Sequence, residues 1–150
     1  MSEARRPSYW EIVAAYLEEG YRAWQAREGA SAKVVEEGLG LSPSEGVAWH
    51  RELESLGLIT MDPVFAANEY RLAPHGLEVA ERLPDIERLI ARQWAVIDAS
   101  TGPPAEKEQA KFNLKTELLK VGVQKGADIA IAHVPSALEQ LHALFSWVKS

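Results

Sequence analysis

The alternation of polar and apolar positions is sharpest in the segment LSPSEGVAWHRELESLGLI, which starts at residue 41. Ser42 with Glu45 three residues later is the pattern of a capping box, in which two side chains satisfy backbone N–H groups reciprocally. Pro43 stands in the first turn, where its missing N–H costs nothing. Gly57 predicts the end of the helix, because glycine tolerates the left-handed backbone that closes many helices. A helix is therefore predicted between Ser42 and Gly57.

A hairpin is predicted directly after this helix. Residues 58–60 (LIT) and 69–72 (EYRL) are short runs of strand-forming residues, and the turn residues Pro63 and Asn68 lie between them. We therefore expect a fold that is mainly α with a small β-hairpin wing.

A long helix is predicted before this segment, because apolar residues recur there at the three-and-four spacing of a buried stripe. Ser8 with Glu11 forms a second capping box, and the helix extends to about residue 27. After it, Ser31 predicts the cap of a short helix from Ala32 to about Gly38. Its face is wide and aromatic, so we expect either a second subunit or the C-terminal helices of the same chain to cover it. The stripe comprises Trp10, Val13, Ala14, Leu17, Tyr21 and Trp24, widened by Tyr9, Ile12 and Tyr16.

Beyond the hairpin, prolines divide a helical pattern into shorter predicted helices. Pro74 opens one helix and Pro84 ends or kinks it, and Pro135 stops a later one. The run STGPP at residues 100–104 is the clearest linker. The predicted domains are residues 1–99 and a helical extension over residues 105–150.

The last predicted helix, which follows a cap at Ser136, carries an apolar seam that needs a partner. We expect this helix and the first one to form the contact of a homodimer, although a cover within one chain would also satisfy the seam. The seam residues assigned to partner binding are Leu141, Phe145 and Val148.

These elements in this order resemble the winged helix-turn-helix regulators of the MarR-like and PadR-like kind. The runs that carry the resemblance are ELESLGLI before the hairpin and YRLAPHGLEVAERL on and after its second strand. Ala73 stands where the family prefers threonine, and Glu36 stands where it favours a small residue against the recognition helix. The resemblance covers roughly the first half of the chain, and it implies a winged helix-turn-helix followed by a helical C-terminal extension.

In that family the helix before the wing enters the DNA major groove. Its periodicity puts Gly46, Trp49, Leu53 and Leu56 on the core side, whereas alignment to the family would bury His50 in place of Trp49. We expect Trp49 to be the buried one, because an indole covers a large apolar area. The resemblance implies DNA contacts by Ser42, Ser44, Val47, Ala48 and Arg51, and phosphate contacts by Lys33 and Arg71 and by Arg5 and Arg6.

The distribution of charge does not support this interpretation. Residues 1–82 carry 8 Lys/Arg against 14 Asp/Glu, and residues 83–150 carry 8 against 8, so the net charge of −6 falls entirely in the first part. Lys and Arg contacts to phosphate supply most non-specific affinity for nucleic acid. In the second part, Lys107, Lys111 and Lys115 lie four apart and would form either a cationic ridge or a solvated face.

A second hypothesis keeps the fold and replaces DNA with a protein partner. The predicted wing has no basic residue, and its tip carries Val64 and Phe65. An exposed Phe65 would suit a protein contact, although it would also fold back onto its own domain. This alternative is a winged-helix interaction module that does not bind DNA.

Motifs of catalysis and metal binding are missing from the sequence. It has no cysteine, no phosphate-binding glycine loop and no serine-elbow or zincin pattern, and His50, His75, His133 and His142 have no metal-ligand spacing. No stretch approaches the length of a membrane span. We therefore expect a cytoplasmic protein that is not an enzyme and takes no metal or cofactor. The family resemblance implies double-stranded DNA as its partner.

Overall fold

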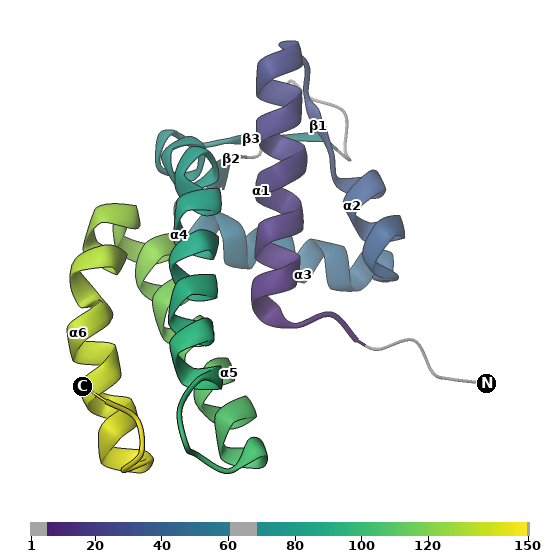
Figure 1. Ribbon diagram of the computed structural model, residues 1–150. Coiled ribbons are helices and arrows are strands. Elements are labelled where there is room, and N and C mark those ends of the chain that lie inside the picture. Colours follow the sequence, from purple (N-terminus) through teal and green to yellow (C-terminus); the bar gives the residue numbers. More distant parts are fainter. Residues whose placement is uncertain (1–5, 61–68, 150) are drawn as a thin grey trace. The chain divides into compact units, whose positions relative to one another are not determined.

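The computed structural model describes residues 6–60 and 69–149, which form six helices and three short strands. The chain divides into two compact units, Met1–Glu81 and Arg82–Ser150. Figure 1 shows the order of the elements. The coarse expectation of a mainly helical protein with a small antiparallel sheet is confirmed.

The first three helices begin at the serine caps that the sequence predicts. The side chains of Ser8, Ser31 and Ser42 each accept a hydrogen bond from a backbone N–H three residues later, and the capping boxes at Ser8 and Ser42 are both present. A serine in this place stabilises a helix by about 1 kcal/mol. The helices are α1 (Tyr9–Ala26), α2 (Ala32–Leu39) and α3 (Pro43–Ser55).

The predicted hairpin belongs to a three-stranded antiparallel sheet. β2 (Ile59–Thr60) and β3 (Glu69–Leu72) pair as expected, with Ile59 opposite Leu72. β1 (Ala30–Ser31) pairs with the other edge of β3, so the order is β1-β3-β2. A two-residue strand has no periodicity, and the sequence therefore did not predict β1.

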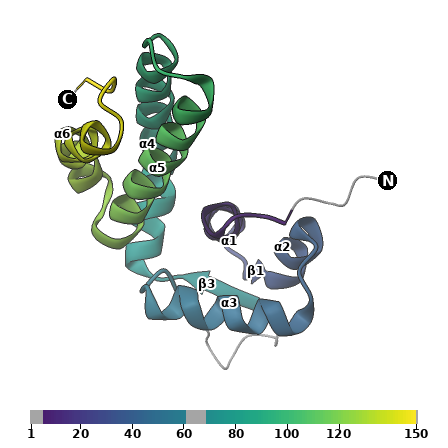
Figure 2. The same ribbon diagram turned by 90° about the horizontal axis from the view of Figure 1, so that it is seen from below.

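The face that α1 buries matches the predicted stripe in part. Ile12, Val13, Tyr16 and Leu17 are buried as expected, whereas Trp24 is 52% exposed. β1, β3 and α2 of the same unit contact α1, so neither a second subunit nor the C-terminal helices are needed to cover this face. Figure 2, which looks along α1, shows β1 and β3 beside it. Gly20 permits this contact, because an added Cβ there would lie 2.5 Å from Leu72 Cδ2.

α4 (Pro74–Asp98) begins against the end of α3. The backbone N–H of Ala73 donates to the carbonyl oxygen of Leu58 at 2.9 Å, and a Cβ on Gly76 would lie 1.9 Å from that oxygen. Only glycine fits this close approach of two backbones.

α4 continues through Pro84, so of the two alternatives predicted for this proline, an end or a kink, the end is wrong. The helix end predicted at Pro135 is also wrong, because α6 (Ala127–Leu144) continues through it. Each proline lies on the exposed side of its helix, next to buried residues such as Leu83 and Val134. Packing of those neighbours offsets the backbone hydrogen bond that a proline removes, and solvent can satisfy the freed carbonyl.

The second unit is built on α5 (Pro104–Lys125) and α6, which lie side by side. Its boundary lies within α4, and not at residues 100–104 as the sequence indicated. That predicted linker is a turn inside this unit, because Trp147 packs directly over Gly102. The buried residues of the helix pair are Ala110, Leu114, Leu118, Ala130, Val134, Ala137 and Leu141.

Candidate nucleic-acid interface

α3 presents one exposed face of small side chains with a single cation. Gly46 and Leu53 are buried on the inner side of the helix, as expected. On the outer side Val47 is 53% exposed, and Arg51 makes no ion pair with any residue in the described ranges 6–60 and 69–149. The exposed residues of this outer face are Ser44, Val47, Ala48, Arg51 and Ser55.

The N-terminal end of α3 is occupied by its own capping box. The backbone N–H of Glu45 donates to Ser42 Oγ at 3.3 Å, and the backbone N–H of Ser42 donates to Glu45 Oε1 at 3.1 Å. The backbone N–H of Ser42, followed by its side chain, lowers the pKa of Glu45 below its ordinary value. Glu45 is therefore ionised at neutral pH, and it places a negative charge where a phosphate would otherwise bind.

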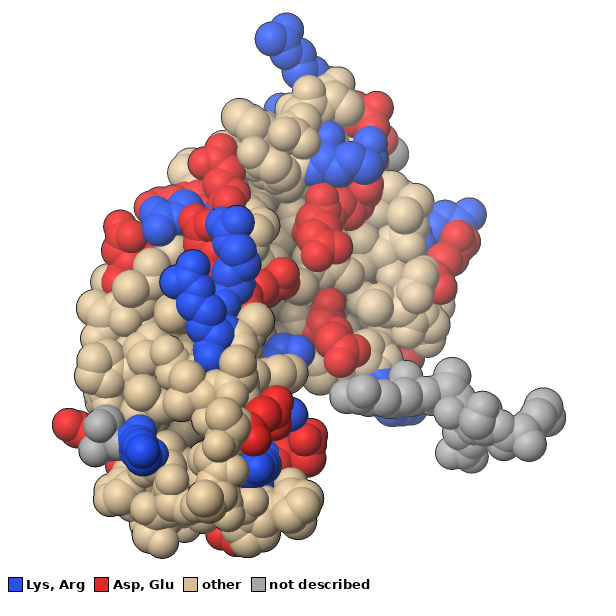
Figure 3. All heavy atoms as spheres, in the orientation of Figure 1, with Lys and Arg blue, Asp and Glu red and all other residues tan. Residues whose placement is uncertain are grey.

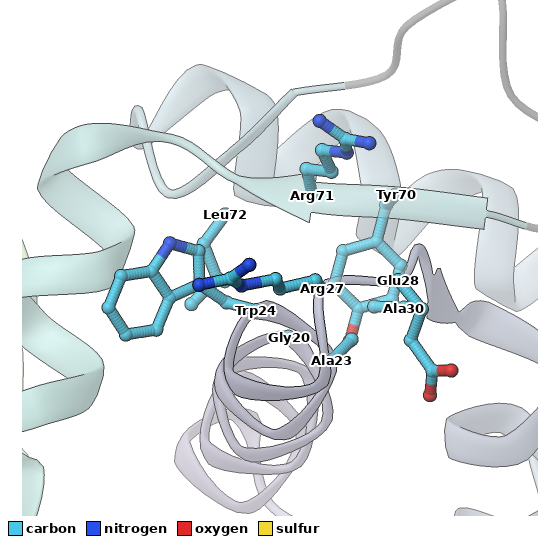
Figure 4. A pocket seen from close by; sticks show the side chains of 9 residues that line it. All are labelled: Gly20, Ala23, Trp24, Arg27, Glu28, Ala30, Tyr70, Arg71 and Leu72. Carbon is cyan, nitrogen blue, oxygen red and sulfur yellow. The ribbon is translucent and has the colours of Figure 1, made fainter.

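Of the predicted phosphate contacts, Arg6 is exposed ahead of α1, and Lys33 and Arg71 lie on α2 and β3. Lys33 is exposed on α2 and lies 3.9 Å from Glu37, an ion pair between two well-solvated side chains. Arg71 is exposed on β3, and Figure 4 shows its side chain on the side of the strand that faces away from α1. Both remain accessible to a ligand, since a solvated ion pair contributes little free energy.

Acidic side chains border the face. Glu52 accepts a hydrogen bond from the hydroxyl of Tyr9 at 2.8 Å, which links α3 to the start of α1. Burial, followed by this contact with Glu52, raises the pKa of Tyr9 to about 12. Glu54 is exposed and follows Arg51 by three residues. Figure 3 shows basic side chains interspersed with acidic ones on the visible face.

α2 and α3 approach closely in spite of Glu36. A Cβ on Gly46 would lie 1.9 Å from Glu36 Oε1, so the glutamate side chain of α2 lies over the glycine of α3. The glycine compensates for the large residue that departs from the family pattern.

The expectation that Trp49 is buried in preference to His50 is wrong. Both residues are partly exposed, but His50 turns toward the core, with its ring 5.5 Å from that of Tyr16 and 6.2 Å from that of Tyr70. Trp49 lies nearer the surface, against Tyr9 at 5.1 Å. The imidazole packs against both tyrosine rings, which are themselves 5.5 Å apart, and sequence periodicity cannot show such a cluster.

The predicted partner-binding residues do not form an exposed seam. Leu141 and Val148 are each only 4% exposed, because α5 and the segment after α6 cover them within the second unit. Phe145 is partly exposed and contacts Trp147. Any contact between two copies must therefore use residues other than Leu141 and Val148.

Phe65, and the wing tip with it, lies outside the described residues, as does Arg5.

The lysines of α5 are mostly engaged inside the second unit. Lys111 Nζ lies 3.1 Å from Asp98 Oδ1 and 3.0 Å from Glu108 Oε1, and Lys107 Nζ donates to the carbonyl oxygen of Asp98. Lys111 and Lys115 also lie over the ring of Trp94. Of the three lysines, Lys111 is therefore paired with carboxylates of α4 and of its own helix.

Neither family models nor curated proteins match the chain. In the part of the chain that the structure describes, no group of three or more His, Asp or Glu side chains is placed to hold a metal ion. Nor does any described helix combine the length and the apolar character needed to cross a membrane.

Proposed function

We propose that the protein is a winged-helix transcriptional regulator that binds double-stranded DNA through α3. The order of α1, β1, α2, α3 and the β2–β3 hairpin, with strand order β1-β3-β2, supports this proposal. In helix-turn-helix proteins the second helix of the motif lies in the major groove and its exposed side chains contact base edges. Under this proposal α3 is that helix, and the protein is not an enzyme and takes no cofactor.

The observation that carries the proposal is Arg51. It is exposed in the middle of a face of small side chains and has no ion pair within residues 6–60 and 69–149. An arginine that is free to reach outward can bond bidentately to the O6 and N7 atoms of guanine. Small neighbours such as Ala48 would let the helix backbone approach the groove closely.

The remaining contacts follow from chemistry. Val47 would pack against a thymine methyl group, and Ser44 would bond a phosphate or a base edge. Arg71 and Lys33 would bind DNA phosphates on either side of α3. Lys33 would exchange its solvated partner Glu37 for a phosphate. Ser42 would mainly stabilise α3 as its N-cap and would contribute less to direct DNA contacts.

A titration of fluorescent duplexes tests this proposal. Duplexes selected from a random library at about 50 mM salt, where electrostatic attraction is strong, provide the ligand. Arg51→Ala should weaken binding to the best duplex roughly tenfold to a hundredfold and relax its base preference, since one bidentate pair contributes about 1–3 kcal/mol. Arg92→Ala, at an exposed position of α4 in the second unit, is the matched control and should leave the affinity unchanged. A wild-type protein that binds no duplex under these conditions would overturn the proposal.

A second candidate function is a winged-helix module that docks a protein and does not bind DNA. The first unit carries seven Lys/Arg against fourteen Asp/Glu, a net charge of −7, which favours a basic protein partner over a phosphate backbone. Under this alternative Arg51→Ala has no effect on sequence-selective DNA binding. The homodimer expected from the sequence stays a prediction, and light scattering of the purified protein measures it.

A further inference from the structure

Three aromatic side chains of the first unit meet where the first turn of α1 contacts the middle of α3. The ring of Tyr9 lies 4.6 Å from that of Trp10 and 5.1 Å from that of Trp49, measured between ring centroids. Tyr9 is 36% exposed, and both tryptophans are partly exposed. Tyr9, Trp10 and Trp49 therefore form an aromatic patch that remains accessible to a partner.

A carboxylate stands on each side of Trp49 along α3. Glu45 precedes Trp49 by four residues and Glu52 follows it by three, so the helix places all three side chains on one flank. Glu52 accepts the hydrogen bond from the Tyr9 hydroxyl at 2.8 Å, which holds this carboxylate against the aromatic patch. The patch is therefore bordered by two acidic side chains of the same helix.

These two carboxylates are not paired with a cation of the protein. Within residues 6–60 and 69–149, no ion pair includes Glu45 or Glu52. Ser42, through its backbone N–H and its side chain, and then the charge of Arg6 lower the pKa of Glu45. The first unit as a whole has a net charge of −7. The patch thus lies in a negative field that attracts a basic partner.

The chemistry of the patch favours an arginine over a lysine side chain. The face of an aromatic ring attracts cations, and the indole of tryptophan does so most strongly. A guanidinium group is flat, so it can stack on such a face while its N–H groups pair with a carboxylate. An ammonium group is compact and more strongly hydrated, and it gains less from this arrangement.

We propose that this aromatic patch, with Glu45 and Glu52 at its borders, docks a basic segment of a partner protein through an arginine side chain. The guanidinium group stacks on the ring of Trp49 and pairs with Glu52, which the Tyr9 hydroxyl holds in place. A nucleic-acid backbone does not fit this surface, because both of its borders are acidic. The proposal adds a protein partner to the regulator, and it does not depend on DNA binding by α3.

Calorimetric titrations of the full chain with matched peptides at about 50 mM salt test the proposal. The peptides share one glycine-serine frame that carries arginines, lysines or citrullines, and citrulline has nearly the shape of arginine without its charge. We expect saturable binding of the arginine peptide, roughly threefold weaker binding of the lysine peptide, and at least roughly tenfold weaker binding of the citrulline peptide. No binding of the arginine peptide up to about 1 mM, or equal binding of the arginine and citrulline peptides, would overturn the proposal.

Paired variants distinguish this surface from the general acidity of the first unit. Glu52→Gln should weaken binding of the arginine peptide at least roughly fivefold, whereas Glu54→Gln removes the same charge from an exposed position nearby and should change it less than roughly twofold. Equal losses from these two variants would mean that the peptide responds only to net charge, and the proposal would be wrong.

The two tryptophans of the first unit that differ in their surroundings provide a second pair. Trp49→Leu keeps an apolar side chain but removes the indole face, and it should weaken binding of the arginine peptide at least roughly threefold. Trp24→Leu, at a 52% exposed position near the other end of α1, should leave the affinity unchanged. The denaturation midpoint of each variant is measured first, since Trp49 also packs against Tyr9. Unchanged binding by a folded Trp49→Leu variant would contradict the proposal.

Discussion

His50 is the residue at which burial and charge act most clearly against each other. Its Nε2 atom is buried and has no hydrogen-bond partner among the described protein groups, and the same is true of the Tyr16 hydroxyl next to it. Burial lowers the pKa of His50 below its ordinary value, although the carboxylates of Glu36 and Glu54 act in the opposite direction. The neutral imidazole is therefore the form that the folded protein favours.

This pKa predicts a loss of stability on acidification. Because the pKa of His50 is lower in the folded state than in the unfolded state, the unfolded state binds the proton more readily. The contribution of His50 is complete above the unfolded pKa of about 6.5, and it is lost as the pH falls from there through the folded pKa. Urea denaturation at about pH 7.5 and about pH 5.5 should show a smaller loss of unfolding free energy for His50→Phe than for the wild type.

His50→Phe also isolates this effect from the carboxylates, which titrate in both proteins. Phenylalanine keeps a ring between Tyr16 and Tyr70 and removes the unsatisfied nitrogen, so its unfolding free energy at about pH 7.5 should not fall by more than roughly 1 kcal/mol. Equal pH dependence of the two proteins would contradict the assignment, and so would an NMR titration that puts the His50 pKa above its ordinary value.

At the scale of elements, substitution of two glycines in the first unit distinguishes the effect of close packing on stability from the effect of helix propensity. Gly76 begins α4 against the backbone carbonyl of Leu58, which cannot move without breaking the hydrogen bond from Ala73. Gly38 lies on the exposed side of α2, where an added Cβ meets nothing within 4 Å. Gly76→Ala should lower the unfolding free energy by about 2–3 kcal/mol through overpacking. Urea denaturation of the purified variant measures this change.

The same substitution at Gly38 is the matched control, with the opposite sign. Alanine is favoured over glycine within a helix, so Gly38→Ala should raise the unfolding free energy by roughly 0.5–1 kcal/mol. If both variants were equally stable, the approach of α4 to Leu58 would not be as close as the structure has it.

Element starts were predictable from the sequence where local chemistry decides them. The serine caps of α1, α2 and α3 need only residues within one turn, and all three were placed correctly. The end at Pro135 was wrong, and so was the alternative of an end at Pro84, because tertiary packing extends α4 and α6 past both prolines. The extra strand β1 exists only through its pairing with β3, forty residues farther along the chain. A pairing of that kind has no local pattern to reveal it.

The candidate site was predictable to the same degree. Helical periodicity alone placed Ser44, Val47, Ala48 and Arg51 on the exposed face of α3, where the structure has them. Trp24 was misplaced, because periodicity assigned it to the core stripe of α1, whereas it is 52% exposed. The left-handed backbone of Arg27, which caps the end of α1, also has no signature in the residue itself, since glycine is the usual signal at that position.

At the scale of the whole molecule, charge decides how DNA would be bound. The chain has a net charge of −6, and the three cations assigned to DNA contacts are Arg51 on the exposed face of α3, Lys33 on α2 and Arg71 on β3. Each phosphate contact contributes about −0.9 to the slope of log affinity against log salt, so three contacts predict a slope no steeper than about −3. The proposed regulator therefore depends on base contacts more than on electrostatic attraction.

An acidic residue beside these cations should accordingly weaken binding, and its removal should strengthen it. Glu54 follows Arg51 by three residues on α3 and is exposed, so it lies where it repels a phosphate that approaches Arg51. Glu54→Gln should raise the affinity for a selected duplex roughly twofold at about 50 mM salt, and the gain should shrink as salt screens the charge. Anisotropy titrations over a salt series measure both effects. Glu139→Gln, an exposed glutamate of α6, removes the same charge from the second unit. An equal gain from that variant would mean that net charge, and not the position of Glu54 beside Arg51, sets the affinity.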